Sequence, residues 1–266
     1  MFIITGSVGI LWGITWYYVY RDQSKHSGLN KAELDYIEKG GGLVHSQTEK
    51  KSAGPENFRW INLKEVFMHR KLWGIYIGQF AVNSTLWFFL TWFPTYLVKY
   101  RGLNFLKSGF LASVPFLAAF VGLLLSGFLS DYLIKKGTSV GVARKAPVIV
   151  GLLLSVSIVG ANYVNSPALI IFFMAVAFFG NGFASITWVF VSTLAPVHLI
   201  GLTGGAFNFI GGLASIIVPV VIAFLARQGS FTPALIFIGI LAFIGACSYI
   251  FLVGKVERIT SKRTSG

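Results

Sequence analysis

The sequence predicts an all-α polytopic membrane protein with about seven transmembrane helices. Two features of the composition support this class: 55% of the 266 residues are hydrophobic, and only 12% are charged. The mean hydropathy of +0.73 also indicates a polytopic membrane protein rather than a soluble domain with a large core. A third observation is the arrangement of the residues, because apolar runs long enough to cross a bilayer alternate with polar connections.

Each apolar run ends where charged residues begin. The runs predict spans over residues 2–20, 72–98, 108–134, 146–164, 167–194, 201–226 and 233–253. The expected organisation is therefore a first helix (1–20), a long polar loop (21–71), a bundle of six helices (72–253) and a short tail (254–266).

The basic residues predict the orientation of these spans. Of the 22 Lys and Arg residues, 18 lie in residues 21–71, 135–145 and 254–266. Because positive charge accumulates in the cytoplasmic loops of membrane proteins, we expect the long loop and the C-terminus to be cytoplasmic, with the N-terminus outside. The lipid bilayer is then the surrounding medium.

The composition also excludes several classes of function. A net charge of +13 would suggest nucleic acid in a soluble chain, but the charges form short clusters between apolar runs and no basic face with interleaved aromatics. Cys247 is the single cysteine and lies in an apolar run, which argues against disulfides and thiolate metal sites. The sequence has no H-E-x-x-H, G-x-S-x-G or phosphate-loop motif. We therefore expect no enzyme, metal, cofactor or nucleic-acid partner.

Four stretches resemble the major facilitator superfamily. They are GQFAVNSTLWFFLTWFPTYLVKYRG at 78–102, GFLSDYLIKKG at 127–137, NGFASITWVFVSTLAP at 181–196 and GGAFNFIGGLASIIVPVVIAFL at 204–225. More narrowly, the chain is similar to the anion:cation symporters, which are bacterial carriers of sugar acids such as hexuronate, glucarate and galactonate. The resemblance implies that residues 1–20 correspond to the sixth of twelve helices and that the last six spans form the C-terminal bundle of the fold.

Polar residues in the second span form the first candidate binding site. Gln79, Asn83 and Trp87 follow one another at four-residue spacing, so they lie along one side of a helix. Polar groups at this depth turn toward protein or a water-filled cavity rather than lipid. Gln79 and Asn83 could bind the hydroxyls or carboxylate of a sugar acid, with Trp87 as an apolar wall. The alternative is that the carboxamides only bond to a neighbouring helix.

Two later spans carry similar stripes. Ser185 and Trp188 resemble the polar and aromatic pair that lines the substrate cavity of this family, and the alternative for them is a packing face. Asn181 lies between two glycines, where we expect close helix packing rather than binding. The resemblance points to Asn208 as a substrate contact, and we expect the glycines around it to serve packing.

The cytoplasmic end of the third span contains a candidate conformational latch. Gly127, Asp131 and Lys135 follow a four-residue spacing in GFLSDYLIKKG. An acid near a helix C-terminus is unfavourable unless a cation compensates, and Lys135 is the local candidate. The resemblance implies that this acid contacts the start of a helix in the other half of the transporter. The alternative is an ordinary solvated charge.

The sequence therefore predicts the C-terminal portion of a secondary transporter that carries an organic anion with a proton by alternating access. No Arg, Lys, Asp or Glu lies at hydrocarbon depth, so we expect an N-terminal half to supply the cation and the proton-carrying carboxylates. We expect the protein in a bacterial inner membrane. The alternatives are a non-transporting scaffold or partner subunit, a relic of a split gene, and a homodimeric pore, which the lack of charged lining residues disfavours.

Overall fold

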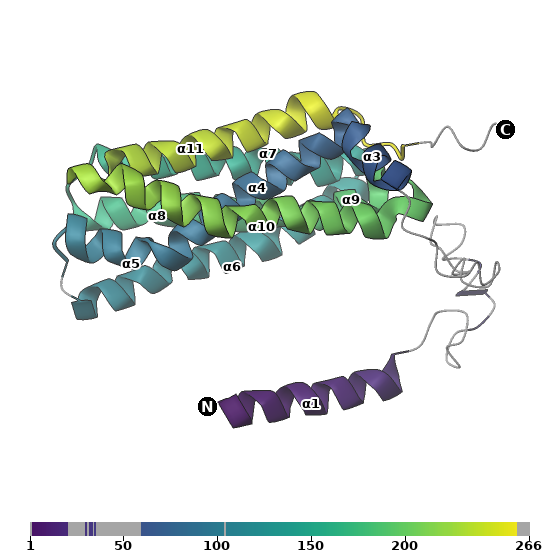
Figure 1. The fold of residues 1–266 in the computed structure, drawn as a ribbon, viewed down its shortest axis with the longest axis horizontal. Helices are drawn as coiled ribbons and strands as arrows, with labels where there is room; N and C mark the ends of the chain where they lie inside the picture. The colour runs from purple at the N-terminus through teal and green to yellow at the C-terminus, as the bar shows by residue number, and fades with distance from the viewer. Residues whose placement is uncertain are drawn as a thin grey trace. The chain divides into compact units, whose positions relative to one another are not determined.

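The computed structural model describes residues 2–20, 30, 32–33, 35, 60–103 and 105–259. The chain divides into two compact units, Met1–Phe58 and Arg59–Gly266. All regular structure among the described residues is helical (Figure 1), which confirms the predicted all-α class. Most of the expected loop 21–71, and the tail after residue 259, lie outside the described residues.

The first unit contains the helix α1 (Phe2–Val19), which has 18 residues. At about 1.5 Å per residue its length is about 27 Å, close to the thickness of the hydrocarbon core. Its large aromatic side chains lie toward the C-terminal end: the ring centroids of Trp12 and Trp16 are 6.4 Å apart, and Trp16 stacks on Tyr20 at 4.8 Å. Such a group of aromatics is typical of a helix end at the membrane interface.

The second unit is a bundle of long helices joined by short turns. Its elements are α3 (Trp60–Met68), α4 (Arg70–Thr91), α5 (Phe93–Thr95), the π-helical η3 (Tyr96–Tyr100), α6 (Phe105–Lys135), α7 (Val140–Ser155), the 3-10 segment η4 (Val156–Asn162), α8 (Pro167–Ala184), the 3-10 segment η5 (Ser185–Trp188), α9 (Val189–Leu194), the 3-10 segment η6 (Val197–Leu199), α10 (Ile200–Leu225), the 3-10 segment η7 (Ala226–Gln228), α11 (Thr232–Cys247) and the π-helical η8 (Ser248–Val253).

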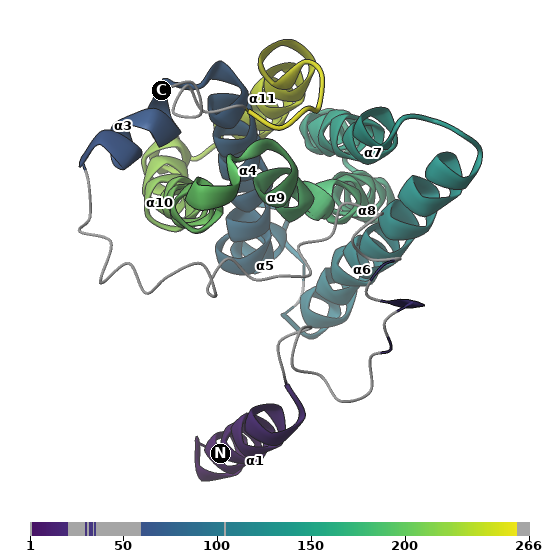
Figure 2. The same ribbon diagram turned by 90° about the vertical axis from the view of Figure 1, so that its right-hand side faces the viewer.

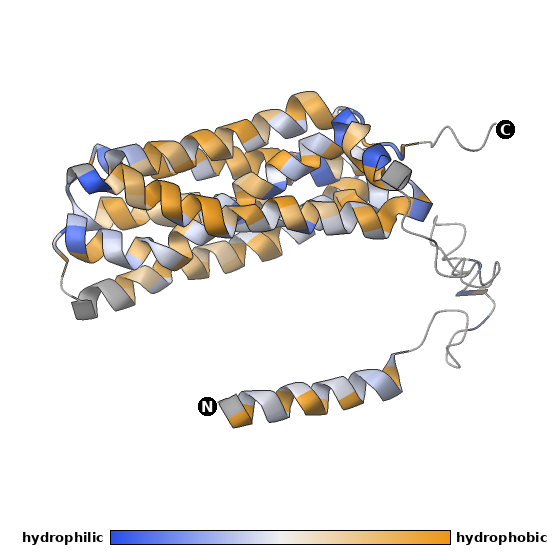
Figure 3. Cartoon of the chain, in the orientation of Figure 1, coloured by the Kyte–Doolittle hydropathy of each residue, from blue (hydrophilic) through white to orange (hydrophobic). Residues whose placement is uncertain are grey.

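Among the described residues, five helices are long and apolar enough to cross a membrane. They cover Phe110–Lys135, Val140–Asn162, Pro167–Leu194, Val197–Leu225 and Thr232–Val253. The expected seven spans also included α1, which forms a shorter apolar helix, and α4, which is not in this group. Figure 3 shows that hydrophobic residues cover the helices of the second unit while hydrophilic ones gather at its two ends.

The position of α4 in the bundle explains its lower hydrophobicity. It packs against α10, α11 and α8, and the view along the bundle shows it surrounded by its neighbours (Figure 2). Of its 22 residues, 12 are buried. A helix so enclosed by protein can carry polar side chains, because their partners are other helices rather than lipid.

Two apolar clusters form the core, and α4 contributes to both. One cluster contains Phe88, Phe89 and Phe93 of α4 and α5 with Phe178 of α8, and the rings of Phe89 and Phe178 stack at 4.1 Å. The other contains residues from the N-terminal part of α4 together with Phe190, Phe207 and Tyr249. Asn83, Ser84 and Thr85 lie between the residues of α4 that belong to the second cluster and those that belong to the first.

Arg101 ties two helix ends together. Its guanidinium donates to the Tyr96 hydroxyl at 2.7 Å, to the Val164 carbonyl at 3.2 Å, and to the Ala161 carbonyl. The two carbonyls belong to the end of η4 and the turn after it, where the helix leaves acceptors without intrahelical partners. A cation at such an end also compensates the negative pole of the helix.

One described residue from each of the three basic segments, namely Arg70, Lys145 and Arg258, lies at the same end of the second unit. Arg258 donates to the Ser192 carbonyl at 3.0 Å, and Lys145 donates to the Gly254 carbonyl at 3.0 Å. Arg70 also donates to the Phe251 carbonyl. These contacts draw residues 254–259 across the ends of the helices, close to the start of α4.

Candidate functional site

A cavity of about 260 Å³ lies between α4, α6 and the α8–η5 segment, and we call it the central cavity. Its walls are apolar except for a group of hydrogen-bonding side chains. Its polar and indole-bearing lining residues are Gln79, Asn83, Asn181, Ser185, Thr187 and Trp188. None of these described lining residues carries a charge. The cavity can therefore bind a ligand by hydrogen bonds but cannot neutralise a charged one.

A chain of hydrogen bonds orders one wall of the central cavity. The Thr187 hydroxyl donates to Gln79 Oε1 at 2.7 Å, and Gln79 Nε2 donates to Asn83 Oδ1 at 3.4 Å. Gln79 and Thr187 are 8% and 1% exposed, so this chain is shielded from competing water. Because both carboxamide oxygens accept bonds within the protein, the second N–H of Gln79 and the N–H groups of Asn83 remain to donate to oxygen atoms of a ligand.

A change of helix type between α8 and α9 positions Ser185 and Thr187 in the cavity wall that faces α4. The α8 helix ends at Ala184, and the next turn, η5, is a 3-10 helix before α9 resumes the α conformation. The Ser185 hydroxyl donates to the Asn181 carbonyl at 2.9 Å within this turn. The tighter 3-10 turn directs Thr187 toward Gln79 of α4, and short 3-10 stretches inside a helix often mark functional positions.

Gly211 of α10 lies against the carboxamides. A Cβ atom at this position would come within 2.7 Å of Gln79 Cγ and 2.9 Å of Asn83 Nδ2. The absence of a side chain at Gly211 therefore lets α10 approach α4 closely and keeps Gln79 and Asn83 in their positions. Gly211 thus has the packing role expected for the glycines of α10, whereas a Cβ atom on Gly205 or Gly212 would meet nothing within 4 Å.

Trp188 separates the central cavity from a second hollow. Its side chain is 48% exposed, and its ring lies edge-on to Phe207 at 5.2 Å. The second hollow has a volume of about 500 Å³ and is lined by Trp188, Ser192 and Asn208 among others. Trp188 thus contributes to both spaces.

The structure brings four of the six candidate binding residues into one cavity: Gln79, Asn83, Ser185 and Trp188. Asn208 lies in the adjoining hollow, which shares Trp188 with the central cavity. Trp87 is half-buried against the apolar cluster of Phe88 and does not line either space.

Two polar lining residues of the central cavity, Asn181 and Thr187, are not among the predicted binding residues. The sequence predicts no role for Thr187, and for Asn181 it predicts close helix packing. Thr187 is a polar residue between Ser185 and Trp188 in the sequence, which is the one signal for it. Regular α-helical spacing, however, places Thr187 on another side of the helix. The structure places both residues in the wall of the central cavity.

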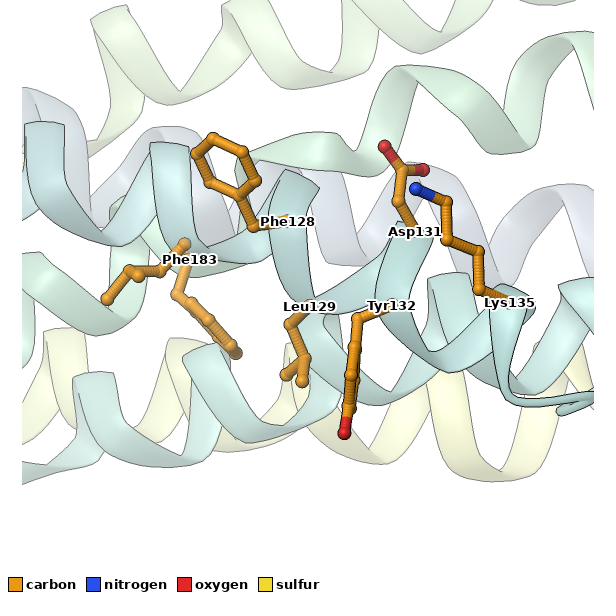
Figure 4. Close-up of a pocket in the computed structure, with 7 residues that line it drawn as sticks. Phe128, Leu129, Asp131, Tyr132, Lys135 and Phe183 are labelled. Carbon is orange, nitrogen blue, oxygen red and sulfur yellow. The ribbon is translucent and has the colours of Figure 1, made fainter.

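The candidate latch residues lie at the end of α6. Asp131 and Lys135 line an open hollow of about 730 Å³ together with Phe128, Leu129 and Tyr132. Both charged side chains extend from the same side of the helix (Figure 4). Gly127 lies one turn earlier, where a Cβ atom would meet nothing within 4 Å. Asp131 is therefore accessible to another helix at this position.

Comparisons with known proteins agree with this architecture. The family model of the Major Facilitator Superfamily matches residues 1–219. The chain is 57% identical over 259 residues to a D-galactonate transporter of Escherichia coli O6:H1, and the matched region covers 97% of this chain and 60% of that protein. It is 41% identical over 268 residues to a probable galactarate/D-glucarate transporter of Escherichia coli K12, covering 100% and 60%. A probable galactarate/D-glucarate transporter of Bacillus subtilis is 42% identical over 264 residues, covering 99% and 58%. The chain thus spans about 60% of the length of these curated relatives.

Proposed function

Because this multi-pass membrane protein belongs to the major facilitator superfamily, we propose that it forms part of a secondary transporter for an organic anion of the sugar-acid class. The relatives at 57% and 41% identity are named as transporters of galactonate and of galactarate or D-glucarate. Those substrates are small polyhydroxylated acids, and their oxygen atoms suit a cavity rich in amide and hydroxyl groups.

The observation that carries the proposal is the shared cavity of Gln79, Asn83, Ser185 and Trp188. Gln79 and Asn83 present N–H donors because their oxygens already accept bonds from Thr187 and Gln79. Such donors match carboxylate and hydroxyl oxygens. The broad ring of Trp188 supplies an apolar wall for the carbon chain of the substrate. Asn208 joins the site if the ligand extends past Trp188 into the second hollow.

The charge of the substrate requires groups that the central cavity does not contain. Its lining within the described part of the chain is uncharged, and an unpaired carboxylate is costly to bury. We propose that an N-terminal half supplies the cation for the substrate and the carboxylates that carry a coupled proton. The longer relatives have room for such a half, because this chain spans about 60% of them.

Alternating access is the proposed mechanism of transport. In transporters of this architecture, two helical bundles rock against each other around a site near mid-membrane. The large apolar side chains that α6 and α10 expose, such as Phe120, Phe128, Phe209 and Phe224, offer surfaces for lipid or for the second bundle. Asp131 of α6 would serve as the latch by contacting a helix of that bundle. The basic end of the unit would face the cytoplasm of a bacterial cell.

Uptake of labelled galactonate, galactarate and glucarate tests the proposal. The chain is produced in bacteria lacking their own carriers, either alone or with the part of the Escherichia coli O6:H1 galactonate transporter that lies outside the match. We expect uptake with the added part, acceleration by an inward proton gradient, and loss on Gln79→Ala. Normal membrane insertion with no uptake in either arm would contradict the proposal and favour a scaffold or relic.

A further inference from the structure

Asn181 is held in place by the two glycines beside it. A Cβ atom on Gly180 would come within 2.4 Å of the Gly151 carbonyl oxygen of α7, and one on Gly182 within 2.0 Å of the Ala119 carbonyl oxygen of α6. The backbone of α8 is therefore pressed directly against both neighbouring helices. Because α8 cannot turn without a clash, the side chain of Asn181 is kept in the wall of the central cavity.

The carboxamide of Asn181 differs from the other two in the cavity. Its side chain is 4% exposed, and its Oδ1 atom is buried with no hydrogen-bond partner in the part of the chain that the structure describes. Gln79 Oε1 and Asn83 Oδ1, in contrast, each accept a bond. Buried acceptors in folded proteins almost always have a donor, because an unpaired one loses its bonds to water without replacement. Asn181 lines the central cavity, so a ligand bound there could supply the donor.

We propose that Asn181 is a specificity-determining residue whose carboxamide oxygen accepts a hydrogen bond from a hydroxyl group of the transported acid; this inference rests on the proposed function. An ionised carboxylate has no hydrogen to donate, so the substrate group that pairs with Oδ1 is a hydroxyl. The oxygen reaches the ligand when the carboxamide turns about its Cβ–Cγ bond, a torsion with broad energy wells. The substrate class is thereby narrowed to polyhydroxylated acids, and simple dicarboxylates are disfavoured.

A cycle of protein and substrate changes separates this role from packing. Asn181→Leu keeps the branching of the side chain at Cγ and removes its polar atoms, although leucine is the larger residue. This variant and the unchanged chain are each produced with the added part of the Escherichia coli O6:H1 transporter. Uptake is measured for D-galactonate and for four analogues, each of which lacks one hydroxyl group at C2, C3, C4 or C5. Asn162→Leu is the matched control, because the Asn162 amide donates to the Thr232 carbonyl at 3.4 Å and lies outside the cavity.

We expect the unchanged chain to discriminate against one deoxy analogue by about tenfold or more in kcat/KM. Asn181→Leu should lose a similar factor toward galactonate and should no longer discriminate against that analogue. Asn162→Leu should retain the discrimination. A residue that only packs would lower uptake of all five compounds equally, since it does not sense a single hydroxyl.

The outcomes distinguish this inference from the proposed function. Uptake by the unchanged chain, with equal discrimination in Asn181→Leu, would overturn the inference and leave the proposed function standing. No uptake by the unchanged chain would overturn both. Asn181→Ala provides a smaller second variant, and loss of both Asn181 variants from the membrane would show that the carboxamide is needed for folding, which would also overturn the inference.

Discussion

The hydroxyl of Thr187 donates a hydrogen bond of 2.7 Å to the carboxamide oxygen of Gln79, which lies 108 positions away in the sequence. The bond joins the 3-10 turn of η5 to the middle of α4 and is buried at both ends. It also decides which atoms of Gln79 are available to a ligand. The oxygen is occupied, whereas the amide nitrogen gives one N–H to Asn83 and retains the other.

Replacing Thr187 by valine tests this bond. The variant keeps the shape of the side chain but leaves Gln79 Oε1 without a donor, which costs about 1–3 kcal/mol of stability. We expect a lower thermal midpoint in detergent and a raised KM for the sugar acid, with both restored by Thr187→Ser. Thr91→Val is the control, because the exposed Thr91 bonds only to Trp87 of its own helix. An unchanged midpoint and KM in Thr187→Val would show that the bond has no role.

Gly211→Ala tests the close approach of α10 to the carboxamides. The new methyl would lie within 2.7 Å of Gln79 Cγ and 2.9 Å of Asn83 Nδ2, and overpacking of this kind costs about 1–3 kcal/mol. We expect weaker substrate binding, measured as a higher KM for uptake, because both carboxamides must shift. Gly212→Ala is the matched neighbour, since its Cβ atom meets nothing within 4 Å.

The comparison of the two alanine variants is informative in both directions. Replacing glycine by alanine in a helix stabilises it by up to about 1 kcal/mol. Gly212→Ala should therefore be neutral or slightly stabilising and leave uptake unchanged. If both variants have the same KM, Gly211 does not position the carboxamides.

Arg101→Ala tests the tie between η3 and η4. The substitution leaves the Ala161 and Val164 carbonyls and the Tyr96 hydroxyl without their charged donor. Hydrogen bonds to charged groups contribute about 1.5–3 kcal/mol each at most, so we expect a loss of about 2 kcal/mol or more in the free energy of unfolding. Thermal unfolding in detergent measures it. The exposed Arg227 at the same end provides a control variant, Arg227→Ala, which should have little effect.

Asp131→Asn tests the proposed latch. The residue is exposed in this structure, so its loss should leave the stability of the chain unchanged. If the carboxylate holds one conformation of the complete transporter, uptake should fall by about five- to 150-fold, the range of typical coupling energies. Uptake kinetics of the chain with its added N-terminal part are the measurement. Full activity of Asp131→Asn would identify Asp131 as an ordinary solvated charge.

The helices themselves could be predicted from the sequence because apolar runs of sufficient length end at charged residues. The predicted span 167–194 corresponds to α8, η5 and α9, which begin at Pro167 and end at Leu194. The 3-10 turn within it could not be predicted, since hydropathy does not change there. The helix α3 (Trp60–Met68) lies within the predicted loop 21–71, so the sequence did not predict it.

The candidate site was predictable only in part. Helical spacings of four and three residues correctly grouped Gln79 with Asn83 and Ser185 with Trp188. Spacing within one helix does not reveal which helix lies opposite. A regular helix turns about 100° per residue, so Thr187 is expected about 200° away from Ser185, whereas the 3-10 turn changes this angle. The close helix packing expected around Asn181 is present at its flanking glycines. That Asn181 also lines the central cavity could not be predicted, because it depends on where α6 and α4 lie relative to α8.

The central claim is that the uncharged side chains of α4 and η5 form part of a ligand chamber rather than a sealed helix interface. Leu86→Cys places a thiol in the wall of that cavity, in a Cys247→Ala background. Leu153→Cys on the exposed face of α7 is the control. A small charged thiol reagent reacts with the thiolate, which forms in water and not in lipid.

The most direct test is the rate at which this reagent labels Leu86→Cys in membranes, with the chain and the added N-terminal part present. The account predicts labelling of Leu86→Cys that galactonate slows, together with an inert Leu153→Cys. A Leu86→Cys thiol as inert as that of Leu153→Cys, or labelled at the same rate with and without galactonate, would contradict it.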